Sequence, residues 1–188
     1  LGEGAMGVVY RAWQRSTARE IALKILPIEP DLQAQNPREY AEVRARFRRE
    51  VQLAARIDSP FIARVHDSGE LPDGGLYFAM ELVAGTPLDK VLIAERRLAP
   101  MRVLRIGREL GTALGQVHAL GLVHRDVKPG NLMVVKHPKG GEALKLVDFG
   151  IARAVEVDLQ MGRAALTNLT VAGTLIGSFA YMAPEQVA

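Results

Sequence analysis

The chain has 188 residues, of which 48% are hydrophobic, 24% charged and 5% aromatic. These fractions are typical of a folded globular protein and exclude a disordered tail, a collagen-like repeat and a charged linker. Cysteine is absent, which excludes a disulfide scaffold, a thiol catalyst and a cysteine-ligated zinc site and favours a cytoplasmic location. No apolar run reaches the roughly 18 residues that a membrane span needs, so we expect any membrane anchor to lie outside this chain.

Charge gives little support for nucleic-acid binding. The chain has 24 Lys and Arg against 21 Asp and Glu, a net charge of +3. The densest basic run, residues 38–56, mixes both signs, and Glu42 can pair with Arg46 at helical spacing. Because contacts to phosphate favour a stripe of one sign, we interpret this run as a solvated helix face.

The first 83 residues are predicted to form strands and one helix. Residues 8–13 and 20–26 are short apolar runs separated by a polar turn, which predicts an antiparallel hairpin. Two more strands are expected over 62–68 and 76–83. After Pro37 a helix is predicted, because one face repeats at steps of four and three through Val43, Phe47, Glu50, Ala54 and Ile57.

Beyond residue 84 the pattern becomes helical. One apolar stripe stops before Gly121, a residue suited to a helix C-terminus. Its members are Val103, Ile106, Leu110, Leu114 and Val117. Residues 132–135 and 144–147 are predicted to form a hairpin, and the aperiodic stretch 152–178 is predicted to be a functional loop.

Glycines near the N-terminus predict contact with a polyphosphate. Gly2, Gly4 and Gly7 have the spacing G-x-G-x-x-G, and Val9 follows two positions later. A dinucleotide-binding fold needs a helix after these glycines, whereas strand-forming residues follow here. The context favours a glycine-rich loop over a nucleotide, with an ordinary tight hairpin as the alternative.

Lys24 and Glu50 are predicted to pair. Strand alternation places Lys24 on the same face as Ala22, away from Leu23 and Ile25. Glu50 occupies an inward position of the predicted helix, where an isolated carboxylate is costly. An ion pair would give the Lys24 ammonium and the Glu50 carboxylate a partner each and would hold the ammonium ready for phosphate oxygens. Taken alone, each residue would be interpreted as a side chain whose charged end reaches solvent at the rim of the core.

A second cluster is more specific. Asp126, Lys128 and Asn131 fall within six residues, and Asp148 follows a predicted strand. A carboxylate, an ammonium and an amide beside a second carboxylate supply the parts of a metal-assisted phosphoryl transfer.

Together these motifs resemble protein kinases, specifically the eukaryotic-like (Hanks-type) Ser/Thr kinases of bacteria. The resemblance implies an α+β, two-lobed protein-kinase-like fold with an antiparallel N-lobe sheet, one main N-lobe helix and a mainly helical C-lobe. Residues 1–83 would be the N-lobe with an incomplete first strand. Residues 84–188 would be a partial C-lobe through the activation segment, without its C-terminal helices, so we expect residues 1–188 alone to be poorly stable.

The resemblance implies ATP and Mg²⁺ as cofactors and protein Ser/Thr hydroxyls as acceptors, in signal transduction. In the N-lobe, the glycines cover the phosphates, Lys24 contacts them and pairs with Glu50, and Met80 lies behind the adenine. The implied adenine contacts are Val9, Ala22 and Met133, with hinge backbone groups from Glu81 and Val83. In the C-lobe, Asp126 orients the acceptor hydroxyl, Lys128 offsets γ-phosphoryl charge, and Asn131 and Asp148 hold magnesium.

The family pattern also implies regulation. Thr167, Thr170 and Thr174 lie in the aperiodic loop, and a phosphate there could order the loop against Arg125, with a homodimer performing the autophosphorylation. Ser178 stands where the family usually has threonine, before the closing motif Ala183-Pro184-Glu185.

One further departure from the family pattern and two alternatives accompany this interpretation. Lys24 and Glu50 lie 26 positions apart, more than is usual in the family, which predicts an inserted loop and helix around residues 30–37. His124 is expected to pack beside Phe149, and the other histidines to be ordinary surface or packing residues. The main alternative is a truncated or pseudokinase module that binds nucleotide and regulates a partner; a nucleic-acid-binding domain is the other.

Overall fold

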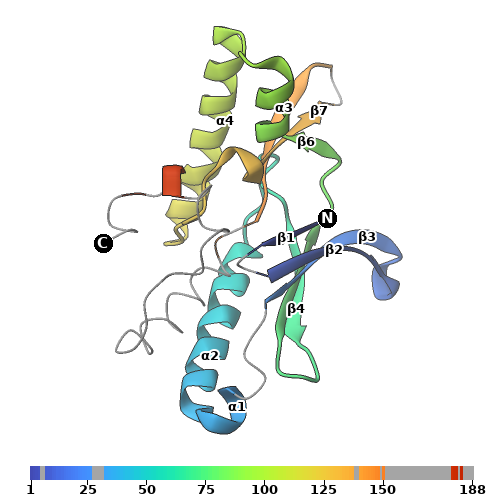
Figure 1. The fold of residues 1–188 in the computed structure, drawn as a ribbon, viewed down its shortest axis with the longest axis vertical. Helices are drawn as coiled ribbons and strands as arrows, with labels where there is room; N and C mark the ends of the chain where they lie inside the picture. The colour runs from blue at the N-terminus through green and yellow to red at the C-terminus, as the bar shows by residue number, and fades with distance from the viewer. Residues whose placement is uncertain are drawn as a thin grey trace.

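The computed structural model describes residues 1–4, 7–26, 32–137, 140–148, 150, 179–181 and 183. One part of the molecule holds a sheet and a long helix, and the other holds two helices and a smaller sheet (Figure 1). The first part contains β1 (Gly2–Gly4), β2 (Gly7–Gln14), β3 (Arg19–Leu26), α1 (Leu32–Gln35), α2 (Pro37–Ala54), β4 (Val65–Glu70) and β5 (Leu76–Glu81). The second contains β6 (Gly85–Pro87), α3 (Leu88–Glu95), α4 (Pro100–Ala119), β7 (Leu132–Lys136) and β8 (Glu142–Leu146). Short 3-10 turns lie at Arg15–Thr17, Pro129–Asn131 and Phe179–Tyr181.

The larger sheet is antiparallel with the order β1-β2-β3-β5-β4. The predicted β2–β3 hairpin is confirmed, with Gln14 opposite Arg19 at its closed end. β4 begins at Val65 rather than at the predicted Ile62. The reason is that Ile62 and Ala63 bond to β8 instead, where the Ala63 N–H donates to the Leu146 carbonyl at 2.8 Å.

Helix α2 covers this sheet. Pro37 occupies its first turn, and the Asn36 side chain accepts a hydrogen bond from the Glu39 N–H at 3.3 Å, which caps the helix. Its buried residues are Tyr40, Val43, Phe47, Val51 and Ala54. The predicted stripe was therefore wrong at one position, because Val51 takes the core place assigned to Glu50. The short helix α1 lies inside the predicted insertion.

Helix α4 packs on the smaller sheet, whose order is β6-β7-β8. The predicted hairpin of β7 and β8 is confirmed. The predicted apolar stripe of α4 was partly wrong: Val103 is 51% exposed, whereas Glu109 joins Ile106, Ala113 and Val117 on the buried face. β6 and α3 were not anticipated.

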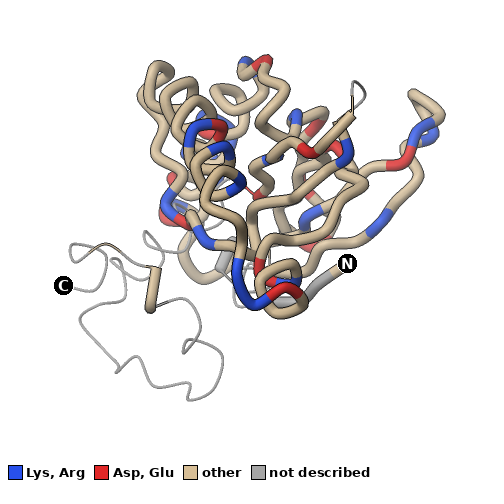
Figure 2. Tube along the Cα trace, turned by 90° about the horizontal axis from the view of Figure 1, so that it is seen from above, with Lys and Arg blue, Asp and Glu red and all other residues tan. Residues whose placement is uncertain are grey.

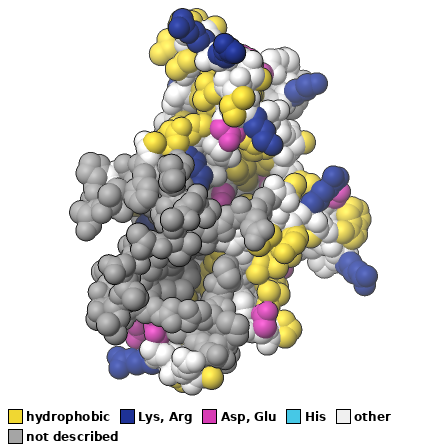
Figure 3. All heavy atoms as spheres, viewed as in Figure 1, with side chains coloured by type: hydrophobic (Ala, Val, Ile, Leu, Met, Phe, Trp, Pro, Cys, Tyr) yellow, Lys and Arg dark blue, Asp and Glu magenta, His cyan; other side chains and the backbone are white. Residues whose placement is uncertain are grey.

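Apolar side chains are exposed at the end of the molecule where α3 and α4 lie (Figure 3). They include Ile93, Met101 and Leu104. Among the described residues, no helix is both long and apolar enough to cross a membrane. The predicted loop 152–178 lies outside the described residues.

Candidate active site

The register of the larger sheet brings the N-terminal site residues onto one face. Val9 lies opposite Lys24, Lys24 opposite Phe78, and Ala22 opposite Met80. Directly opposite residues in an antiparallel pair point to the same side, so these side chains share a surface. Lys24 is only 3% exposed, and it shares its face of β3 with Ala22, as strand alternation predicted.

The glycine-rich segment contributes to β1 and β2, which pair at the edge of the larger sheet. Gly4 pairs with Gly7, and Gly2 pairs with Val9. Gly7 has a φ of 109°, a conformation that residues with a side chain rarely adopt. The backbone conformation at Gly7 therefore favours glycine at the third glycine position of the motif.

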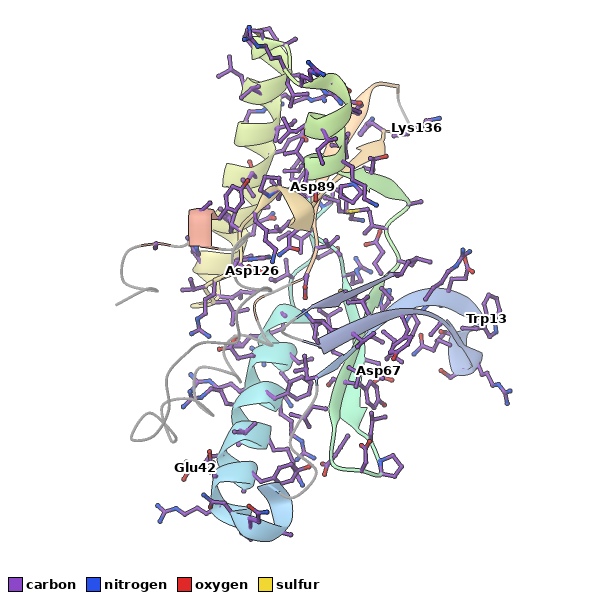
Figure 4. All side chains as sticks on the ribbon, viewed as in Figure 1. Trp13, Glu42, Asp67, Asp89, Asp126 and Lys136 are labelled. Carbon is purple, nitrogen blue, oxygen red and sulfur yellow. The ribbon has the colours of Figure 1, made fainter. Side chains whose placement is uncertain are left out.

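Three residues of the loop after α4 lie in contact with one another. The Asn131 Nδ2 donates to both the backbone carbonyl and Oδ2 of Asp126, each at 2.8 Å. The Lys128 Nζ lies 2.8 Å from the same Oδ2. Asp126 is 6% exposed and Asn131 8% exposed. The Asp126 carboxylate is therefore buried, and the Lys128 ammonium and the Asn131 amide hold it in place. Figure 4 places Asp126 where the second part of the molecule, which contains α3 and α4, meets helix α2 of the first part.

Asp148 follows β8, and the residues on either side of it are hydrogen-bonded to the loop that carries Asp126. The Val147 N–H donates to the Asn131 carbonyl at 2.9 Å, and the Gly150 N–H donates to the His124 carbonyl at 3.0 Å. Asp148 has a φ of 59° and Arg125 a φ of 62°. Non-glycine residues in this left-handed region store strain that packing must sustain, and such strain is concentrated at functional sites.

The predicted ion pair between Lys24 and Glu50 is wrong for this structure. The Lys24 Nζ instead lies 2.5 Å from Oδ1 and 2.6 Å from Oδ2 of Asp148. Glu50 pairs with Arg125, at 3.4 Å between Oε1 and an Arg125 nitrogen. The physical reason is that the left-handed turn at Asp148 presents both carboxylate oxygens to Lys24, while Glu50 lies beside the buried face of α2 and within reach of Arg125.

The donor set suits magnesium. The described residues hold no group of three His, Cys, Asp or Glu side chains that could enclose a metal ion. Magnesium, however, is commonly held by one or two protein oxygens together with substrate phosphates and water. Because the Asn131 Nδ2 is committed to Asp126, its Oδ1 is the atom that this residue could offer, beside a carboxylate oxygen of Asp148.

The segment between the two parts is held by contacts that the sequence did not reveal. The Glu81 N–H donates to the Arg64 carbonyl at 2.8 Å. The Glu81 carboxylate pairs with the Lys145 Nζ at 2.5 Å. Lys145 lies on β8, 64 positions from Glu81, so only the folded chain shows the pair. Val83 is half-buried, and Met133 lies on β7 opposite Pro87 of β6.

His124 is buried and only 2% exposed. Burial lowers its pKa below the usual value, against the opposing effect of the Asp148 and Asp126 carboxylates. Its predicted neighbour Phe149 lies outside the described residues, as do Thr167, Thr170, Thr174, Ser178, Pro184 and Glu185. The residues assigned to the adenine, the phosphates and the hinge stay predictions.

Comparison with known proteins agrees with this geometry. Residues 1–188 match the family described as the protein kinase domain. The chain is 39% identical over 186 residues to the serine/threonine-protein kinase PknD of Mycobacterium tuberculosis, which covers 99% of this chain and 25% of that protein. It is 38% identical to pkn3 of Myxococcus xanthus, over 99% of this chain and 32% of that one.

Solved structures show the same fold. The crystal structure of the Mycobacterium tuberculosis PknI kinase domain matches with a TM-score of 0.63 and 38% identity, covering 80% of this chain and 57% of that one. The chain thus spans about a quarter to a third of the two curated relatives named above. The Asp126–Lys128–Asn131 cluster, the adjoining Asp148 and the match over residues 1–188 lead to one conclusion: this chain belongs to the protein kinase domain family.

Proposed function

We propose that the protein containing this chain is a Ser/Thr protein kinase that transfers the γ-phosphoryl group of ATP to hydroxyl groups on proteins. The observation that carries the proposal is the fixed Asp126 carboxylate, held by Lys128 and Asn131 and joined through the backbone to Asp148. Phosphoryl transfer needs positioning and charge stabilisation more than covalent chemistry, and this cluster supplies both.

In this proposal Asp126 accepts the proton of the attacking hydroxyl and aims its oxygen. Lys128 stands 2.8 Å from that carboxylate and would offset negative charge on the transferred group. Asn131 and Asp148 would hold magnesium, which when bound neutralises phosphate charge. Lys24 would leave Asp148 for the phosphates, and Glu50 would leave Arg125 for Lys24, so catalysis requires both observed ion pairs to exchange partners.

Binding of ATP would use the shared face of the larger sheet. Val9 and Ala22 from the sheet and Met133 from β7 would enclose the adenine, with Met80 behind it. The Glu81 N–H is bonded to Arg64, so the hinge group that Glu81 would offer is its carbonyl, and Val83 would offer the next backbone group. Gly2, Gly4 and Gly7 would approach the phosphates with their N–H groups.

The test is phosphate transfer from radiolabelled ATP to general protein substrates, followed by phosphoamino-acid analysis, on the full-length protein. Asp126→Asn should lower turnover by about a hundredfold or more with nucleotide binding retained. Asp148→Asn should impair both magnesium-dependent binding and turnover. Asp67→Asn is the matched control, because Asp67 is exposed on β4 and lies well away from Asp126 (Figure 4). Full activity in both active-site variants, or mainly phosphotyrosine, would overturn the proposal.

Loop phosphorylation belongs to the same proposal. The printed sequence places Thr167, Thr170 and Thr174 between Gly150 and Ala183, and Arg125 precedes Asp126. Mass spectrometry of ATP-treated protein should find phosphate on this segment, added by a second copy of the kinase. Absence of phosphate from an active preparation would remove this part of the proposal.

The two alternatives predict different results. A nucleotide-binding regulatory module would bind ATP without transferring phosphate in any variant. A nucleic-acid-binding domain would show binding that falls steeply with salt. Figure 2 shows Lys and Arg interspersed with Asp and Glu along the described trace rather than gathered in one stripe, which does not favour that alternative.

A further inference from the structure

We propose that Glu109 is a positioning residue for Asp148, acting through β8, an inference that rests on the proposed kinase function. Glu109 lies on the buried face of α4 and is 7% exposed. Its Oε2 accepts a hydrogen bond from the backbone N–H of Leu144 at 2.7 Å, in a buried setting. An apolar side chain would fill this place without the cost of removing a carboxylate from water. The presence of a buried carboxylate here therefore points to a specific structural role.

The reason lies in the position of β8 at the edge of its sheet. Edge strands carry N–H groups that no neighbouring strand satisfies. On this edge, the Leu146 N–H donates to the Phe61 carbonyl at 2.7 Å. The Leu144 N–H donates to Glu109. The Glu109 carboxylate therefore replaces a strand partner and joins β8 to α4 at a fixed point along the strand.

Two arginines of α4 extend this attachment to the start of β8. Arg102 and Arg105 both pair with Glu142, at 2.8 and 3.0 Å. Residues 102, 105 and 109 follow helical spacing, and residues 142 and 144 follow strand alternation, so one face of α4 holds alternate residues of one strand edge. The side chains of Glu142 and Arg105 are 37% and 31% exposed, and solvent weakens such pairs. The buried Glu109 bond is expected to dominate.

What the attachment fixes is the relation between the two catalytic segments. α4 ends at Ala119 and leads into the loop that carries Asp126, whereas β8 ends at Leu146, two residues before Asp148. The joint between α4 and β8 therefore sets how the two carboxylates stand relative to each other. Partners hydrogen-bonded directly to metal ligands typically change metal affinity by about 10- to 100-fold when removed. Glu109 acts one step further away, through the β8 backbone, so its removal should affect magnesium use by the lower end of that range.

The experiment compares Glu109→Leu, Glu109→Gln and Ala113→Gly in the full-length protein. Glu109→Leu removes the acceptor for the Leu144 N–H, whereas Glu109→Gln keeps an acceptor oxygen. Ala113→Gly lies one turn away on the same buried face, is 0% exposed in the parent, and lowers stability without involving β8 edge groups. Each variant is melted first, and all titrations are run well below the lowest melting temperature.

The decisive readout is the magnesium concentration that gives half-maximal binding of a fluorescent ATP analogue, with phosphate transfer measured alongside. We expect Glu109→Leu to raise that concentration about tenfold, Glu109→Gln to stay within about threefold of wild type, and Ala113→Gly to lower only the melting temperature. Wild-type magnesium dependence in Glu109→Leu, or equal loss in Glu109→Gln and Glu109→Leu, would overturn the proposal. Because binding is measured separately, absence of phosphate transfer in the wild type would contradict the proposed function and not this inference.

Discussion

Gly150 lies where the segment after Asp148 touches the loop before Asp126, and it leaves no room for a side chain. A Cβ placed on Gly150 would lie 2.0 Å from the His124 carbonyl oxygen, whereas ordinary contact begins at 3.4 Å. Gly150→Ala therefore requires the two backbones to separate by about 1.4 Å. The obstacle is backbone rather than the end of a flexible side chain, so rotamer changes cannot relieve it.

The separation should reduce catalysis far more than it reduces folding. It breaks the Gly150 N–H bond to the His124 carbonyl, now 3.0 Å, and such a bond contributes about 1 kcal/mol to the free energy of unfolding. A misplacement of about 1 Å can lower the rate on the order of a hundredfold. We therefore expect kcat to fall about a hundredfold while most of the protein stays folded at 25 °C.

Steady-state phosphate transfer and thermal melting on the same preparations test this expectation. Gly115→Ala is the control, because Gly115 lies in α4 with nothing within 4 Å of an added Cβ. A Gly150→Ala protein with kcat within about threefold of wild type would refute the reasoning. The two backbones could then separate without moving Asp126 or Asp148.

Three further outcomes follow from particular contacts. Gly115→Ala should raise the free energy of unfolding by about 0.5–1 kcal/mol, because alanine favours a helix interior and the position is open; an unchanged or lower value in denaturant titration would contradict this. Arg125→Met removes the partner of Glu50 and should tighten binding of a fluorescent ATP analogue by up to about fivefold, the range of a partly exposed pair, whereas weaker binding would show that the pair does not compete with nucleotide. Burial lowers the pKa of His124, so the unfolded chain takes up its proton first: stability is complete above about pH 6.5 and falls as the pH drops below it. Denaturant titrations at pH 7.5 and 5.5 should show this loss, and His124→Phe should reduce it.

Local patterns predicted much of the fold. The β2–β3 and β7–β8 hairpins and helix α2 depend on the periodicity of residues close in the chain and, for α2, on the helix start at Pro37. The cluster of Asp126, Lys128 and Asn131 could be recognised as a motif because its residues lie within six positions of one another. In each of these cases the decisive contacts are short in sequence.

The sequence could not predict contacts that depend on tertiary packing. Lys24 and Asp148 are 124 positions apart, and both Glu50 and Asp148 are acceptable partners for a lysine. Which one is chosen depends on the backbone turn at Asp148. Glu109 was missed because carboxylates rarely occupy a buried helix face, and only the edge of β8 explains its presence. β4 started later than expected because Ile62 bridges to β8.

If Asp148 holds magnesium as proposed, its bond to Lys24 would couple magnesium affinity to helix α2. In the described arrangement a cation approaching Asp148 must displace an ammonium that holds both carboxylate oxygens. The released ammonium is stabilised only where another anion receives it, and Glu50 can do so once it leaves Arg125. Under the proposed magnesium role, a partner that drew Glu50 toward Lys24 would strengthen metal binding by the same factor by which the metal would strengthen binding of that partner. A protein docking on the outer face of α2 could thus tune the metal requirement without reaching the nucleotide.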